Sequence, residues 1–232
     1  MSAIIVAEGL VHYEVIGRGR PLVFVHGWFG SWRYWVPAME HISSTHRTYA
    51  LDLWGFGDSD RQSNRYHTDA YVDLLCAFLD RLGLHEITLV GHALGGMVAL
   101  RLAATHPERV SRLMGICVPV LGTAINRPMP FRLGNGDSLA RLAPRAISSS
   151  PELETEARKA DSLAISSTLR AAVDQDMRKD LSLLKVPVLL VYGGNDPLIR
   201  SPEAELQEAN GHPSRVMVLE GAQHFPMLEN RN

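Results

Sequence analysis

The chain has 232 residues, 46% of them hydrophobic and 21% charged, and this composition is typical of a globular protein with one sizeable core. The formal net charge of −2, with mixed signs, lacks the basic footprint expected of a protein that binds nucleic acid or anionic membranes. No apolar run approaches the roughly 20 residues of a membrane span. The first residues, MSAIIVAEGL, lack the basic region of a signal peptide.

The two cysteines, Cys76 and Cys117, fall in separate predicted elements and lack the spacing of metal ligands. Two reduced thiols are typical of a cytoplasmic protein. We therefore expect a cytoplasmic location, no metal, no cofactor, and no membrane or nucleic-acid partner. The sequence makes no prediction of the oligomeric state.

Strand and helix patterns alternate along most of the chain. The first predicted strand alternates apolar and polar residues, as a half-exposed strand does, and apolar runs typical of strands buried on both faces follow. The predicted strands are 10–17, 21–27, 47–53, 86–91, 110–117, 186–193 and 214–221.

Helical patterns lie between several of these strands. The first has an amphipathic stripe and ends at Gly83, a natural C-cap, and the second is stopped by Pro107. The predicted helices are 69–82, 94–106, 201–209 and stretches within 152–184. This order predicts an α/β fold with a doubly wound, mostly parallel sheet covered by helices.

The strand rhythm breaks once, between residues 119 and 185. This segment has proline- and glycine-bearing stretches and then helical patterns, so we expect a small helical cap inserted between core strands. The core then comprises residues 1–118 and 186–232, and the cap residues 119–185. Open α/β sheets bind ligands at the carboxyl ends of their strands, where such a cap would roof the site.

The stretch VGHALGG, residues 90–96, has the spacing of a nucleophile elbow, a tight turn from strand to helix that holds a reactive residue in strained φ/ψ. Ala93 occupies the reactive position between Gly91 and Gly95, and its methyl group cannot act as a nucleophile. The five-residue pattern is weak alone. The predicted strand before it and helix after it favour a catalytic turn.

Two backbone N–H groups near this turn are candidates for an oxyanion hole. In HGWFGSWRYW (26–35) the chain leaves a strand and turns the N–H of Trp28 into the site, and the N–H of Leu94 follows the elbow residue. Two such donors stabilise an acyl-transfer transition state by several kcal/mol. We expect His26 to bond within its loop. The aromatic rings of Trp28 and Phe29 either line an acyl pocket or pack in the core.

Two more residues complete a candidate catalytic set. Asp196 follows a strand in VYGGNDPLI (191–199), and His224 follows the last strand in EGAQHFPMLEN (220–230). Taken singly, the first is typical of a simple turn and the second of a solvated loop. The chain order of elbow, aspartate and histidine is that of a Ser–Asp–His triad. His224 would then be the general base, and Asp196 would fix its tautomer.

Together these motifs resemble the α/β-hydrolase superfamily, in its small cap-bearing esterase and lactonase branch. The resemblance covers nearly the whole chain and runs through HGWFGS, DLWGFGDSD, LVGHALGG, HPERV, VPVLLVYGGNDPLI and GAQHFPMLEN. It implies the triad and oxyanion roles given above, and a structural turn at 52–59. Haloalkane dehalogenases and epoxide hydrolases of similar fold need an aspartate at the elbow, which this chain lacks.

The chain departs from the family at Ala93, where a serine is expected, and at its end, where only residues 225–232 follow the histidine instead of a closing helix. The cap is also short. Engineering that trimmed the chain and replaced the serine would explain these departures, and a natural sequence with another residue at the elbow is the alternative.

Three hypotheses follow. The chain is an esterase or lactonase whose nucleophile was replaced, a natural enzyme in which His224 activates water without a serine, or a non-catalytic protein that holds a small molecule. The predicted pocket walls favour a small hydrophobic ester or lactone, although C–C hydrolysis or perhydrolysis would use the same triad. Besides Trp28, those walls are Phe29, Met97 and Val118.

Overall fold

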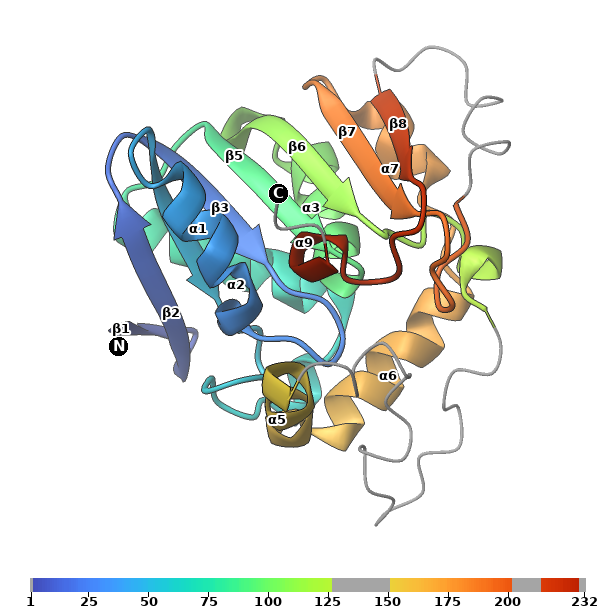
Figure 1. Cartoon of the computed structure of the whole chain (residues 1–232). Coiled ribbons are helices and arrows are strands. Elements are labelled where there is room, and N and C mark those ends of the chain that lie inside the picture. Colours follow the sequence, from blue (N-terminus) through green and yellow to red (C-terminus); the bar gives the residue numbers. More distant parts are fainter. Residues whose placement is uncertain (1, 127–150, 202–213, 230–232) are drawn as a thin grey trace.

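An eight-stranded sheet forms the centre of the protein (Figure 1). The computed structural model describes residues 2–126, 151–201 and 214–229. The strand order is β1-β2-β4-β3-β5-β6-β7-β8, and every pair from β4 to β8 in this order is parallel. The strands are β1 Ser2–Val6, β2 Gly9–Gly17, β3 Arg20–Val25, β4 His46–Leu51, β5 Ile87–His92, β6 Val110–Ile116, β7 Val188–Gly193 and β8 Ser214–Leu219.

The first strand was not predicted, because the hairpin turn after it lacks the asparagine or glycine that usually marks such a turn. β1 pairs antiparallel with β2 up to Val6 opposite Gly9, so Ala7 and Glu8 form a two-residue turn. Their φ angles are 46° and 67°, values that asparagine and glycine adopt most readily in such turns. A sequence without those residues gives no hairpin signal at this point.

Helices cover both faces of the sheet (Figure 1). The helices α1 (Val36–Ile42) and α9 (Pro226–Glu229) lie on one face, and α2 (Thr68–Leu82), α3 (Leu94–Thr105) and α7 (Arg178–Leu183) lie on the other. None of the described helices is long and apolar enough to cross a membrane. Short 3-10 turns are Trp32–Trp35, Ser63–Arg65, Pro107–Arg109 and Gly122–Ala124. The predicted doubly wound α/β fold is confirmed.

The amphipathic helix α2 follows its predicted pattern. Gly83 ends it in the left-handed conformation at φ 63°, and its N–H donates to the carbonyl of Asp80 at 3.2 Å. The apolar stripe faces the core and is fully buried at Tyr71, Leu74, Leu75, Phe78 and Leu79.

The predicted helical stretch 152–184 forms α5 (Pro151–Lys159), α6 (Ser162–Val173) and α7. α6 is tied to the loop after β3, because the Trp28 indole N–H donates to Thr168 Oγ1 at 2.9 Å. α7 instead packs against α3. The division between core and cap at residues 118 and 186 stays a prediction, and the helix predicted at 201–209 lies almost wholly outside the described residues.

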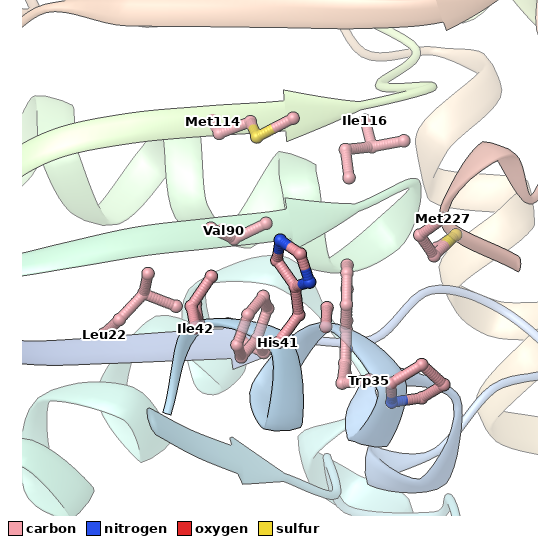
Figure 2. A pocket seen from close by; sticks show the side chains of 11 residues that line it. Leu22, Trp35, His41, Ile42, Val90, Met114, Ile116 and Met227 are labelled. Carbon is pink, nitrogen blue, oxygen red and sulfur yellow. The ribbon is translucent and has the colours of Figure 1, made fainter. Parts of the chain in front are cut away.

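An apolar pocket of about 470 Å³ lies on the sheet face between α1 and α9 (Figure 2). Side chains of β3, β5 and β6 line it, together with Trp35, His41 and Met227 from the helical segments. None of the predicted site residues lines this pocket.

Replacing Ala7 by asparagine and Glu8 by glycine should stabilise the fold. Both residues are exposed, and the left-handed conformation costs a residue with a side chain about 1–2 kcal/mol. We expect the free energy of unfolding in urea to rise by about 1 kcal/mol. As a control, Glu220→Gly changes an exposed turn residue outside the left-handed region and should lower it. A double variant no more stable than the parent would contradict this account of the turn.

Candidate active site

The stretch VGHALGG forms a sharp turn between β5 and α3. Ala93 has φ 47° and ψ −110°, a conformation that costs a non-glycine residue on the order of 1–3 kcal/mol. Its N–H donates to the carbonyl of Ile116 at 2.8 Å, and its side chain is fully buried. The strained turn expected from the sequence is therefore present, with alanine at its apex.

Close backbone contacts explain the two glycines of this turn. A Cβ on Gly91 would lie 2.4 Å from the carbonyl oxygen of Gly95. A Cβ on Gly95 would lie 2.4 Å from the carbonyl oxygens of both Val25 and His26. The first turn of α3 thus rests directly on the end of β3, at a distance that only glycine permits.

Asp196 and His224 meet although they lie 28 residues apart. His224 Nδ1 and Asp196 Oδ2 are 2.8 Å apart, and both side chains are almost completely buried. A carboxylate only accepts, so Nδ1 carries the proton, and in the neutral ring Nε2 carries the lone pair. This is the tautomer that a general base needs.

Asp196 is held in its ionised form by several donors. Its second oxygen accepts the N–H groups of Leu198 at 2.8 Å and Ile199 at 3.1 Å. Burial by itself raises the pKa of Asp196, but the hydrogen bond and charge of His224 and the two N–H groups outweigh burial and hold the pKa below its usual 3.8. At neutral pH the carboxylate is therefore charged and orients the imidazole.

The loop after β3 is fixed by His26 and Asp52. His26 Nδ1 lies 2.9 Å from the carbonyl oxygen of Gly27, and Nε2 accepts the Leu53 N–H at 3.0 Å. The hydrogen bond of His26 to Gly27 is the one expected within its own loop. Its hydrogen bond to Leu53 links this loop to the loop after β4. Asp52 accepts the Trp32 N–H at 2.8 Å, so its carboxylate has a structural contact, as the resemblance implies.

The two predicted oxyanion donors lie close to the elbow. Leu94 is the first residue of α3, so its N–H has no acceptor within the helix. The Trp28 N–H makes no hydrogen bond to a described residue. A Cβ on Gly27 would lie 2.9 Å from the Ala93 Cβ, so the peptide before Trp28 runs against the elbow. An oxyanion hole requires donors that are unpaired in this way, and that role stays a prediction.

The fold agrees with the comparison to known proteins. Residues 20–143, more than half of the chain, match the family model of the α/β-hydrolase fold. The chain belongs to this family. It is 32% identical over 233 residues to the dihydrolipoyllysine-residue acetyltransferase component of an acetoin cleaving system from Pseudomonas putida, and the match covers 94% of this chain and 62% of that protein. The chain thus spans less than two thirds of that relative.

Other relatives are similar in length to the chain. It is 27% identical over 235 residues to a pimeloyl-(acyl-carrier protein) methyl ester esterase from Neisseria meningitidis, covering 91% of this chain and 89% of that protein. The solved enol-lactonase from Burkholderia xenovorans LB400 has a TM-score of 0.84 at 20% identity, covering 98% of this chain and 94% of that chain. This last likeness shows the shared fold.

The predicted pocket residues Phe29, Met97 and Val118 are all buried in this member of the family. The side chain of Val118 packs against α3, because a Cβ on Gly96 would lie 2.3 Å from its Cγ2. The Trp28 ring is fully buried as well. These contacts are those of core residues, and a contact of these side chains with substrate stays a prediction.

Among the residues that the structure describes, two groups of side chains bring potential metal-ligand atoms within 4.8 Å of one another: His92, Cys117 and His224, and His12, Asp52 and Asp58. In the first group, His92 Nε2 and His224 Nδ1 already form hydrogen bonds within the protein. Burial, with the nearby Asp196 carboxylate, raises the pKa of the Cys117 thiol well above 9.0, which disfavours the thiolate that binds metals. The expectation of no metal stays a prediction.

Tyr34 and His92 join the site without having had a predicted role. The Tyr34 hydroxyl lies 3.1 Å from His92 Nδ1, across 58 residues of sequence. In the sequence, only the position of His92 directly before the elbow residue could have indicated that it belongs to the site. No motif spacing links His92 to Tyr34 in the aromatic stretch HGWFGSWRYW.

Two buried histidines should make the stability of the fold depend on pH. Burial lowers the pKa of His26 and lowers that of His92 well below 6.5. Below pH 6.5 the unfolded chain therefore binds protons that the native state does not, and stability falls as the pH falls. We expect the free energy of unfolding to drop toward pH 5 by up to about 1.4 kcal/mol per pH unit for each histidine.

Urea denaturation of variants at several pH values checks this slope. His92→Gln should make the dependence of the unfolding free energy on pH less steep, because the unfolded chain then binds one proton fewer below pH 6.5. His85→Gln, at an exposed position, serves as the matched control and should leave the slope unchanged. The slope of the parent also contains the opposite contribution of His12, whose pKa is raised by its contact with Asp52. A slope that His92→Gln leaves unchanged would therefore refute the neutral state of the buried His92 ring.

Proposed function

We propose that this scaffold is that of a hydrolase of carboxylic esters or lactones working by Ser–His–Asp acyl transfer, and that Ala93 leaves it without its nucleophile. The observation that carries the proposal is the buried hydrogen bond of 2.8 Å between His224 and Asp196 in a family member with a strained elbow. The similar Neisseria esterase acts on a methyl ester and the Burkholderia protein of the same fold is an enol-lactonase, and both support the same substrate class.

A serine at position 93 would allow each step of this chemistry. His224 Nε2 takes the hydroxyl proton while the serine oxygen attacks the carbonyl carbon of the substrate. The carbonyl oxygen becomes an oxyanion that accepts from the N–H groups of Trp28 and Leu94. The tetrahedral intermediate then expels the alcohol, which receives the proton from His224. Water, deprotonated by the same nitrogen, then attacks the acyl carbon. The bond to the serine oxygen breaks, the acid leaves, and His224 returns the proton to the serine.

With Ala93 this sequence cannot begin, because a methyl group has neither a lone pair nor an acidic proton. The dyad and the candidate oxyanion donors keep their arrangement, so the chain would bind a small hydrophobic ester or lactone without acylation. The segment 119–185 would form a helical cap over this site. The bond from Trp28 to Thr168 supports that placement, since it ties α6 to the loop of a candidate oxyanion donor.

Ala93→Ser should restore esterase activity. We expect hydrolysis of p-nitrophenyl acetate and p-nitrophenyl butyrate to rise by several orders of magnitude, since removing such a nucleophile costs about 10⁶-fold in subtilisin. The double variant Ala93→Ser with His224→Ala is the matched control and should return the rate to background. A serine variant no faster than the Ala93 protein would contradict the proposed acyl transfer.

The Ala93 protein itself separates the proposal from its alternatives. Incubated with an ester or a lactone and analysed by mass spectrometry, the ligand should come back unchanged. Hydrolysis that disappears in His224→Ala would instead show that His224 activates water directly. An unchanged ligand together with an inactive serine variant would favour a non-catalytic binding protein.

A further inference from the structure

His92, the residue before Ala93, connects parts of the site that are far apart in the sequence. Its imidazole is fully buried, with Nε2 2.8 Å from the carbonyl oxygen of His224 and Nδ1 3.1 Å from the Tyr34 hydroxyl. The Tyr34 hydroxyl accepts the N–H of Gly27 at 2.6 Å. A line of hydrogen bonds thus runs from the loop after β3 to the loop that carries His224.

The chemistry of the partners sets the direction of each bond. A carbonyl oxygen only accepts, so His92 Nε2 carries a proton. Burial, reinforced by His224, lowers the pKa of His92 well below 6.5, so the ring is neutral and Nδ1 accepts the Tyr34 proton. Burial raises the pKa of Tyr34 well above 10.0, so the hydroxyl keeps that proton to donate. Both ring nitrogens of His92 are therefore satisfied, as a buried network requires.

Ring contacts hold the same loop. The ring centroid of His92 lies 4.7 Å from that of His224 and 5.1 Å from that of Phe225. The Tyr34 ring meets Phe225 edge to face at 6.1 Å. Asp196 holds His224 at Nδ1, whereas His92 holds the backbone from which that imidazole projects.

We propose that His92 is a positioning residue for the general base: its Nε2–H, directed by Tyr34, holds the His224 carbonyl and sets the place of the imidazole between Asp196 and the elbow. This inference rests on the proposed function, which gives His224 the role of base. His92 touches no substrate in this scheme and acts through His224. Without it, a buried carbonyl loses its donor, and the loop must shift or admit water.

The protein with Ala93 allows a test that needs no catalysis. In ¹⁵N-histidine-labelled protein, the His224 Nδ1 proton shared with Asp196 should give a low-field imidazole signal in NMR spectra. His92→Phe keeps a buried ring but removes both hydrogen bonds, so we expect this signal to broaden or vanish. His92→Gln retains a donor and an acceptor and should preserve it. An unchanged signal in a folded His92→Phe protein would overturn the proposal.

Tyr34→Phe tests the same line of bonds with a smaller change. It removes one hydroxyl and leaves the ring in place, so His92 loses the group that orients it. We expect the His224 Nδ1 proton to exchange with solvent several-fold faster than in the parent. If His92→Phe does not fold, Tyr34→Phe decides the question, and an unchanged exchange rate overturns the proposal.

The two His92 variants in the Ala93→Ser background test whether the position of His224 affects the catalytic rate. His92→Phe should lower kcat for p-nitrophenyl butyrate about tenfold with little change in KM, because the His224 carbonyl loses its buried donor and the base is less well placed. His92→Gln should recover most of that loss. Equal kcat values in all three proteins would speak against positioning. An inactive Ala93→Ser protein would refute the proposed function, while the NMR signal would still decide the role of His92.

Discussion

The first turn of α3 lies on the end of β3 at backbone contact distance, and the geometry of the whole candidate site depends on this contact. Gly95 has no side chain to hold the carbonyl oxygens of Val25 and His26 away, so the helix begins directly above the strand. The chain passes from β5 to that position through the strained backbone of Ala93, at φ 47° and ψ −110°. Backbone packing imposes this conformation, and it strains any residue that carries a Cβ, alanine and serine alike.

Around this turn, burial has opposite consequences for histidine and aspartate. His26 and His92 lose water, and burial outweighs the nearby acceptors and carboxylates, so the pKa of each is lowered. Asp196 is buried too, but His224 and two backbone N–H groups stabilise its charge more than burial destabilises it. The site thus combines neutral rings that hold loops in place with one carboxylate that orients the candidate base.

Polar contacts join α6 to the loop after β3 and α5 to the loop after β4. The Trp28 indole reaches Thr168 at 2.9 Å, and Lys159 on α5 pairs with Asp58 at 3.0 Å. The ion pair is partly exposed and contributes little by itself. The buried bond from Trp28 matters more, because its residue also supplies a candidate oxyanion donor. A displacement of α6 would therefore strain or break this bond and move the loop after β3.

The sequence by itself determined the buried strands, the capped helix α2 and the chain order of Ala93, Asp196 and His224, because apolar period, glycine and motif spacing are local properties. It did not reveal β1, since Ala7 and Glu8 occupy a turn that normally signals itself through asparagine or glycine. Nor did it pair Tyr34 with His92, or His92 with the carbonyl of His224, 132 residues away. Only the tertiary structure decided those contacts. A buried polar group pairs with the donors and acceptors that packing brings within hydrogen-bond distance. Separation along the chain does not predict which residues these are.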